Sequence, residues 1–363
     1  MFADILLWMT HKYKIKETLP SLLIVLSGVT CSTAAALMAL TENSNGGKGM
    51  IKLTNSQLNY GKKTNLLHSV LKNYDLYILV LPAIVYVFIF NYVPMYGITI
   101  AFKDFMPRQG ILGSPWIGFR QFNRFFSSYY FKELITNTFL LSFLSLLAGF
   151  PAPIIFALML NQIYHEKYKR FTQTVSYAPH FISTMVLVGM INIFISPRSG
   201  FINILIRMFG GETIHFQTSP YWFRPIYIIS GIWQNTGWNA IVYLAALTSI
   251  DQEMLEASTV DGANKFQKII YIEIPSILPT IVILLILGLG NIMSVGFQKA
   301  FLLQTPMNLQ TSEIIATYVY KVGLLENQFS FSTAVSLFDN VINLIFLILV
   351  NSIAKRVQEV SLW

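Results

Sequence analysis

Charged side chains are scarce in this sequence of 363 residues: they make up 12% of it, against 54% for apolar residues. An average soluble protein carries about a quarter charged residues. The composition therefore excludes an ordinary soluble globular fold. Cysteine is nearly absent as well, because Cys31 is the single one, which excludes an intrachain disulfide and a multi-cysteine metal site.

Motifs for nucleotide or metal chemistry are also missing. A phosphate-binding P-loop needs G-x-x-x-x-G-K-[ST], and the two nearest stretches, residues 46–49 and 61–64, do not match it. His165 and Glu166 begin an H-E-x-x-H zinc motif, but Lys169 takes the place of the second histidine. The sequence has no G-x-S-x-G nucleophile elbow either. These gaps indicate transport rather than bond chemistry, and no metal bound by this chain.

Long apolar runs are what the chain has instead. About 20 residues of α-helix span a bilayer core of about 30 Å. Five runs without any Asp, Glu, Lys or Arg reach this length, and a sixth contains one acid, Asp339, whose cost of about 3 kcal/mol apolar neighbours can offset. The predicted spans are residues 76–98, 135–161, 172–197, 225–250, 274–298 and 331–354. They predict an all-α integral membrane protein with six core transmembrane helices.

A further uncharged run, residues 19–40, follows a basic stretch near the N-terminus. Three interpretations are open: an extra N-terminal helix, a cleaved signal sequence, or a start of translation at Met50. The polar segment 41–63 separates the run from the rest of the chain, and we favour the extra span or the start-site artefact over cleavage. We divide the chain into an N-terminal segment, residues 1–74, and a transmembrane domain, residues 75–363.

Positive charge does not settle which side of the membrane each loop occupies. With residues 41–75 placed inside, the inner segments from residue 41 onward carry twelve Lys and Arg residues and the outer ones ten, which is a weak bias. The net charge of +8 suits contact with anionic membrane lipid. The basic residues are scattered and form no stripe that could follow a phosphate backbone, so we expect no nucleic-acid partner.

One segment between two uncharged runs breaks the apolar pattern. Seven of the 25 residues in 251–275 are charged, so the segment is expected in water or against a partner. Gly262 interrupts it and suits a tight bend with positive φ, and Asn264 can cap a second helix. We predict two short helices joined at Gly262, with small side chains at Ala257 and Ser258 leaving room for a partner's surface.

This segment resembles the EAA signature of the inner-membrane permease subunits of binding-protein-dependent ATP-binding-cassette (ABC) importers. The family pattern is E-A-A, three residues, G, nine residues, I-x-L-P; here Ser258 replaces the second alanine and Ile274 the leucine. Nearby residues are similar to the maltose-type carbohydrate permeases. The residues that carry the resemblance are Glu256, Ala257, Ser258, Asp261, Gly262, Ala263 and Pro275. Two other stretches, 81–94 and 115–119, are similar to the polysaccharide and oligosaccharide branch.

The resemblance implies the type I ABC importer permease fold in the bacterial cytoplasmic (inner) membrane, with the EAA segment facing the cytoplasm. It implies that a separate ATPase, which uses ATP and Mg, docks on this coupling segment, so the chain binds no cofactor and is no enzyme by itself. The implied partners are a second homologous permease, two ATP-binding subunits and an extracytoplasmic solute-binding protein. The implied substrate is an oligosaccharide, and the branch includes importers of acidic ones such as alginate or pectin fragments.

Polar and aromatic residues within apolar spans are candidates for contact with the solute. Asn235 and Asn239 lie four residues apart and are expected to share a helix face, which Tyr243 continues. The substrate-path candidates are Trp233, Asn235, Trp238, Asn239, Tyr243, Asn291 and Asn137. Each has an ordinary alternative, since asparagine in a membrane helix often bonds a neighbouring helix and tryptophan often marks the interface.

Two other classes of function are open from the residues alone. An ion-coupled secondary transporter needs repeated halves and ionisable groups within the membrane, whereas Asp339 stands nearly alone and no repeat is visible. A membrane-embedded enzyme needs paired carboxylates or a metal cluster near the bilayer, and neither is visible. The aromatic and arginine-bearing outer segments, 99–134, 198–224 and 299–330, suit either a docking binding protein or the membrane surface.

Overall fold

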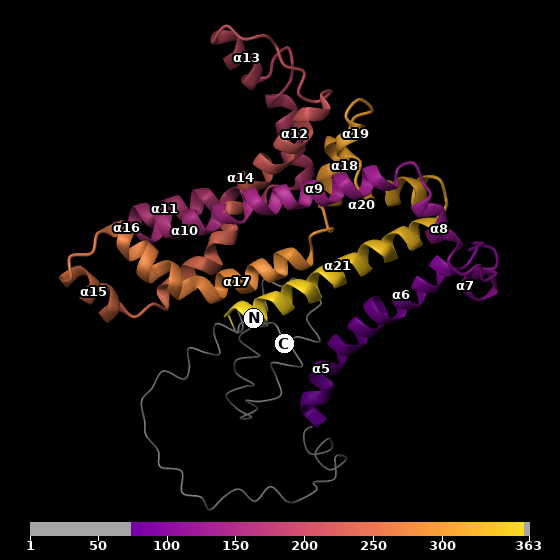
Figure 1. The fold of residues 1–363 in the computed structure, drawn as a ribbon, viewed down its shortest axis with the longest axis horizontal. Helices are drawn as coiled ribbons and strands as arrows, with labels where there is room; N and C mark the ends of the chain where they lie inside the picture. The colour runs from indigo at the N-terminus through magenta and orange to yellow at the C-terminus, as the bar shows by residue number, and fades with distance from the viewer. Residues whose placement is uncertain (1–73, 359–363) are drawn as a thin grey trace, which may run out of the picture. The chain divides into compact units, whose positions relative to one another are not determined.

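The computed structural model describes residues 74–358, which form helices joined by short connections (Figure 1). The prediction of an all-α protein is confirmed: within these residues the only β-type pairing is an isolated bridge between Lys103 and Trp116. Residues 1–73 and 359–363 lie outside the described part. The predicted extra span at 19–40 and the alternative start at Met50 therefore fall outside the described residues.

The chain divides into two compact units between Gly97 and Ile98, and each is described by itself. The described part of the first unit consists of α5 (Tyr74–Val87), the π-helix η2 (Phe88–Tyr92) and α6 (Val93–Met95), followed by the 3-10 helix η3 (Tyr96–Phe102), which enters the second unit. Pro94 has no N–H to donate, and the wide turn η2 lies immediately before the turn that contains it.

The second unit holds the remaining helices in chain order. Before α14 they are α7 (Gly110–Gly113), α8 (Arg120–Phe126), α9 (Phe131–Gly149), α10 (Pro151–Asn161), α11 (Glu166–Tyr177), η4 (Ala178–Phe181), α12 (Thr184–Phe194) and α13 (Phe201–Met208). From there they are α14 (Pro220–Thr248), α15 (Gln252–Val260), α16 (Lys265–Lys268), η5 (Ile269–Glu273), α17 (Ile274–Gly290), α18 (Phe297–Leu303), α19 (Leu309–Ser312), α20 (Ile315–Tyr320), η6 (Lys321–Leu325) and α21 (Phe329–Gln358).

Four helical stretches of the described residues are long and apolar enough to cross a membrane, and one bent pair would make a fifth. The four are Val80–Phe102, Phe131–Asn161, Lys265–Gly290 and Phe329–Ile353. They overlap the predicted spans 76–98, 135–161, 274–298 and 331–354. The third of them differs most, because it starts nine residues earlier than predicted, inside the charged segment, and ends at Gly290.

The predicted span 172–197 is wrong as one continuous helix. The stretch Glu166–Phe181 meets α12 at an angle of 98°. Ile182 is extended at this break, and the Ser183 Oγ accepts from the Val186 N–H at 3.4 Å to begin a new helix. Pro179, in the first turn of η4, has no N–H with which to continue α11. The bend leaves η4 in contact with α14.

The predicted span 225–250 corresponds to α14, whose 29 residues make it about 44 Å long. That length is ample for a bilayer core of about 30 Å. Polar side chains such as Gln234, Asn235 and Asn239 make α14 less apolar than the four spans above. The count of six core helices stays a prediction.

The helix α14 is also the centre of packing in the second unit, because it contacts α9, α10, α11 and α17. A buried apolar cluster joins Ala157 and Leu160 of α10, Ala240 and Leu247 of α14, and Ile277 of α17. Burying a large apolar side chain contributes about 1.5–3 kcal/mol. This cluster therefore ties α14 firmly to the helix that follows the charged segment.

Candidate functional site

The charged segment 251–275 begins with a capped helix. The Asp251 Oδ1 accepts from the Glu253 N–H at 3.0 Å at the start of α15. Both acids lie at the positive end of the helix dipole, which stabilises them there. Glu256, the first residue of the EAA signature, is exposed and accepts from the Gln252 Nε2 at 3.3 Å. The helix α15 thus forms from its own residues.

The joint after α15 is built on Gly262, whose φ is +81°. The Gly262 N–H donates to the Thr259 carbonyl at 3.1 Å, and the Ala263 N–H donates to the Ser258 carbonyl at 3.0 Å. A Cβ added at Gly262 would meet nothing within 4 Å. Glycine is therefore required here for its backbone conformation and not for space inside this chain. The predicted bend with positive φ at Gly262 is confirmed.

The helix after the joint starts at a reciprocal capping box. The Asn264 Oδ1 accepts from the Gln267 N–H at 2.9 Å, and the Gln267 Oε1 accepts from the Asn264 N–H at 2.8 Å. The Lys268 Nζ also donates to the Thr259 Oγ1 at 2.7 Å, so a side chain bridges the two arms of the joint. The prediction that Asn264 caps a second helix is confirmed.

The sequence predicted that this second helix is short. In the structure it is long, because it continues into a membrane span. The stretch Lys265–Gly290 is one apolar helical stretch of 26 residues. Its π-helical turn η5 has the Ile274 N–H bonded to the Ile269 carbonyl, immediately before Pro275, which cannot donate. The residues after the joint at Gly262 therefore continue without a break through α16 and η5 into α17.

The coupling segment, residues 251–275, carries solvent-exposed apolar side chains. Val260 is 88% exposed, Phe266 76% and Tyr271 75%. Small residues lie on α15 beside them: Ala257 is exposed and Ser258 half-buried. Exposed apolar side chains rimmed by polar ones are typical of a protein-binding surface.

Glu273 differs from the other six charged residues of this segment, because it is buried inside the protein although the segment as a whole was expected in water or against a partner. It is 3% exposed, and its Oε1 accepts from the Gln162 Nε2 at 2.8 Å and the Asn161 Nδ2 at 3.2 Å. Hydrogen bonds from two amides satisfy this carboxylate oxygen inside the protein. They join the end of α10 to the start of α17.

A second group of functional candidates forms where η4 meets α14. The His180 ring stacks on the Trp238 ring with a centroid distance of 4.6 Å and an interplanar angle of 2°. The His180 Nδ1 lies 3.2 Å from the Asn235 Oδ1, and the Phe181 ring meets the Trp238 ring edge-on at 5.5 Å. We call His180, Phe181, Asn235 and Trp238 the η4–α14 cluster. It offers an aromatic platform beside amide and imidazole groups.

Sequence reasoning found Asn235 and Trp238 but missed His180. The partners are 55 and 58 positions apart along the chain, so no local spacing connects them. The available signal was the pair Pro179-His180 within an otherwise uncharged apolar run. The packing of α11 and η4 against α14 determines where His180 lies, and neither this packing nor the bend after η4 was predicted.

The other candidates on α14 do not form one face. Trp233 and Asn239 are exposed, whereas Tyr243 is buried within the apolar cluster between α10, α14 and α17. The expectation that Tyr243 continues the face of Asn235 and Asn239 is therefore wrong. Each step of four residues turns the helix by about 40°, and two such steps move Tyr243 round to the α10 side.

The two asparagines outside α14 serve local and tertiary contacts. Asn137 of α9 is 3% exposed; its Nδ2 donates to the Gln310 carbonyl at 2.9 Å and the Glu313 carbonyl at 3.2 Å. Its Oδ1 accepts from the Arg224 Nη2 at 2.8 Å. The Asn291 Nδ2 donates to the Leu287 carbonyl at 3.0 Å, within one helix turn. Asn137 thus holds α9, α14 and the chain around α19 together.

A buried cation lies one turn along α14 from the cluster. The Lys299 Nζ of α18, between the spans, donates to the Tyr227 carbonyl at 2.7 Å and lies 4.6 Å from the centre of the Tyr227 ring. A Cβ on Gly231 would be 3.2 Å from this Nζ, and the Asn235 Nδ2 donates to the Gly231 carbonyl. Burial lowers the pKa of Lys299 to about 8.

A helical membrane unit with a jointed, exposed coupling segment and a polar cluster on its central helix has the architecture of a transport permease. The family model described as "Binding-protein-dependent transport system inner membrane component" matches residues 149–359, more than half of the chain. The chain belongs to this family. It is a membrane component of a transport system, and it is not itself an enzyme.

Relatives match over nearly their whole length. The polygalacturonan/rhamnogalacturonan transport system permease protein YteP of Bacillus subtilis (strain 168) is 42% identical, over 83% of this chain and 94% of the relative. Protein LplB of the same organism is 40% identical, over 84% of this chain and 96% of the relative. The similarity supports the permease class, and it does not support an ion-coupled secondary transporter.

Solved structures of a bacterial ABC transporter have the same fold. One, of a transporter involved in the import of the acidic polysaccharide alginate, matches with a TM-score of 0.76 and 41% identity over 81% of this chain and 99% of that chain. Another, of a bacterial alginate ABC transporter in complex with an alginate pentasaccharide-bound periplasmic protein, matches with a TM-score of 0.76 and 39% identity over 82% and 99%. The type I importer permease fold expected from the sequence is confirmed.

Proposed function

We propose that this chain is one of two permease subunits that line the path of an acidic oligosaccharide in an ATP-driven importer. The observation that carries the substrate class is chemical agreement between two relatives. One is named for polygalacturonan and rhamnogalacturonan, and the other imports the acidic polysaccharide alginate. These polymers share uronic acid residues, so the common chemistry is a carboxylate on each of many sugar rings.

The η4–α14 cluster supports this proposal because it suits a sugar. The Trp238 ring offers an apolar face to the C–H side of a sugar ring, while His180 and Asn235 offer hydrogen-bonding groups for hydroxyls. Lys299 of α18, whose Nζ lies beside Gly231 one turn before Asn235 of α14, supplies a cation for a carboxylate. The path candidates on this helix are Trp233, Asn235, Trp238 and Asn239.

The coupling segment supports a separate source of energy. Its residues Glu256, Ala257, Ser258, Asp261, Gly262, Ala263 and Pro275 form the proposed docking surface for an ATPase. Two ATP-binding subunits, using ATP and Mg, move the joint at Gly262, and α17 transmits this movement because it continues from the same helix. The helices then rock to move the opening of the path from outside to inside.

The remaining partners follow from the same architecture. A second homologous permease completes the path, and an extracytoplasmic solute-binding protein delivers the oligosaccharide. The chain lies as a multi-pass protein in the bacterial cytoplasmic membrane, with residues 251–275 inside. The helix α14 crosses the membrane between this segment and the loop that precedes α14, so that loop lies outside.

Uptake into vesicles tests the proposal directly. The chain is reconstituted with a second permease, ATP-binding subunits and a solute-binding protein encoded beside it, and radiolabelled trigalacturonate is compared with neutral maltotriose. We expect accumulation of trigalacturonate only with internal ATP and the binding protein present. Accumulation driven by an ion gradient without ATP would contradict the energy source, and preference for maltotriose would contradict the substrate class.

A further inference from the structure

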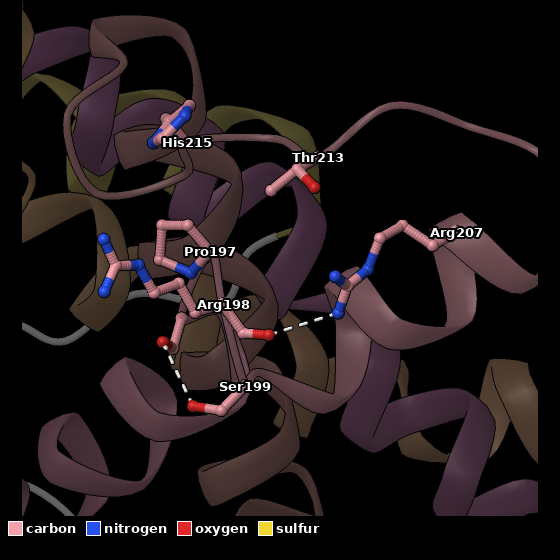
Figure 2. A pocket seen from close by; sticks show the side chains of 7 residues that line it. Pro197, Arg198, Ser199, Arg207, Thr213 and His215 are labelled. Carbon is pink, nitrogen blue, oxygen red and sulfur yellow. Dashed lines mark hydrogen bonds between the residues drawn. The ribbon is translucent and has the colours of Figure 1, made fainter.

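A hollow of about 660 Å³ lies at the outer end of the second unit, between the end of α12, the helix α13 and the connecting segment before α14 (Figure 2). Its polar lining consists of Ser196, Arg198, Ser199, Arg207, Thr213 and His215. We call it the outer arginine pocket. Volumes of about 300–1,000 Å³ are typical of sites for small molecules.

A buried asparagine holds the walls of this pocket in place. Asn203 of α13 is fully buried, and its Nδ2 is directed at the carbonyls of Ser196, at 3.1 Å, and Ile214, at 3.0 Å. Its Oδ1 accepts from the Ile214 N–H at 2.9 Å. One side chain thus fastens the segment with Ser196 and the segment with Thr213 and His215 to the same helix. The pocket is therefore held in shape without a ligand.

The charge of the pocket is positive and uncompensated. The Arg207 Nη2 donates to the Arg198 carbonyl at 3.1 Å (Figure 2). The Arg207 Nε donates to the Asn203 carbonyl at 3.4 Å, so neutral oxygens orient this guanidinium. Arg198 is exposed and, within the described residues, neither arginine forms an ion pair. Glu212 is the one acid between residues 195 and 219, and it pairs with neither.

We propose that the outer arginine pocket binds a uronic acid residue of the transported oligosaccharide on the outer face, an inference that rests on the proposed function. The Arg198 guanidinium is a planar donor fork that matches a carboxylate, and the already oriented Arg207 adds a second positive charge. The hydroxyls of Ser196, Ser199 and Thr213 are partners for sugar hydroxyls.

The shape favours a sugar over an acidic side chain of a partner protein. One aspartate or glutamate side chain fills only a small part of a 660 Å³ hollow, and it has no use for three hydroxyl groups in the wall. A sugar acid uses both kinds of group. The pocket also lies on the side of the membrane from which the substrate arrives, since α14 separates it from the coupling segment.

The test measures binding to the intact transporter without its binding protein. The chain, its second permease and the ATP-binding subunits are placed in lipid nanodiscs and titrated with trigalacturonate by calorimetry. We expect Arg198→Gln to weaken binding at least fivefold. The backbone carbonyl that accepts from Arg207 remains in this variant, so the wall is kept. Methyl-esterified trigalacturonate, which lacks the charges, is expected to bind wild type and variant equally weakly.

Arg108→Gln is the matched control, because Arg108 is another exposed arginine of an outer segment and lies outside the pocket. Equal weakening by both variants would overturn the proposal, because general attraction to the positively charged outer segments would then explain the binding of trigalacturonate. Unchanged trigalacturonate affinity in Arg198→Gln would overturn it too. If Arg198→Gln leaves the trigalacturonate affinity unchanged but abolishes docking of the solute-binding protein, then Arg198 binds a carboxylate of that protein and not one of the sugar. Absent trigalacturonate uptake by the complete wild-type system contradicts the proposed function, whereas normal uptake with no effect of Arg198→Gln on binding contradicts only the pocket.

Discussion

The coupling segment and the η4–α14 cluster differ in how their residues are brought together. In the coupling segment the Gly262 turn and the capping box of Asn264 and Gln267 join residues three to five positions apart. In the cluster His180 meets Asn235 and Trp238 from 55 and 58 positions away. The first is a product of local backbone chemistry, and the second depends on how α11 and η4 pack against α14.

The two regions should therefore be sensitive to different kinds of substitution. A local joint survives changes elsewhere in the fold and fails when its own backbone conformation is made costly. A packed cluster survives changes in any one exposed side chain and fails when the helices that carry it are pushed apart. Three substitutions test this comparison, in order of decreasing expected effect.

The largest effect is expected at Gly237, where the backbone of α14 lies against Ser176 of α11. A Cβ on Gly237 would overlap the carbonyl group of Ser176 and lie 2.9 Å from the Ser176 Cβ. Gly237→Ala must separate the two helices, at an overpacking cost of about 1–3 kcal/mol or more. We expect a large loss of folded protein, measured as the yield of monodisperse complex and its thermal stability in detergent.

Gly189→Ala in α12 is the control for this change. A Cβ there meets nothing within 4 Å, and alanine is favoured over glycine in a helix by about 1 kcal/mol. Its complex should be as stable as wild type or slightly more so. A Gly237→Ala complex with wild-type stability would mean that α11 does not hold the cluster in place.

The second effect concerns the joint. Gly262→Val places a β-branched residue at φ +81°, where L-residues pay about 1–2 kcal/mol or more. We expect normal membrane insertion with ATP-dependent uptake reduced at least tenfold, because the joint rearranges and the docking surface moves with it. Uptake in vesicles and co-purification of the ATP-binding subunits report the two steps.

Gly210→Val supplies a closely matched control in the loop after α13, which the proposed topology places on the other side of the membrane. Gly210 also has φ +81° and also has nothing within 4 Å of its Cβ position. The backbone cost is therefore similar, but the residue lies in the outer loop after α13. Co-purification of the ATP-binding subunits should be unchanged. If both variants lose these subunits equally, the special role of Gly262 in coupling is refuted.

The smallest effect is expected from Trp238→Ala, which removes the stacked ring from the cluster and leaves the coupling segment intact. We expect the KM for trigalacturonate to rise about five- to tenfold, or about 1–1.4 kcal/mol. The basal ATPase rate should not change. Trp233→Ala sharpens the result, since Trp233 is on the same helix and exposed. A larger KM effect at Trp233 than at Trp238 would place the sugar along the other side of α14.

Much of the architecture could be predicted because apolar runs must be buried in lipid whatever their neighbours are. Four of the six predicted spans appear as long apolar helices, and α14 matches a fifth in position. The break at Ile182 and Ser183 was missed, because a proline and a serine within an apolar run are equally compatible with a kinked helix. Burial of Glu273 was missed as well, since its amide partners on α10 lie more than 100 positions away.

The sequence by itself determined the helical class, the joint at Gly262 and the cap at Asn264, because lipid burial, positive φ and helix capping act over a few neighbouring residues. Tertiary structure alone decided that His180 stacks on Trp238, that Tyr243 turns into the core and that Asn203 closes a pocket around two arginines. Those outcomes depend on the relative placement of helices, which results from packing many side chains together and is not written in any single stretch of the chain.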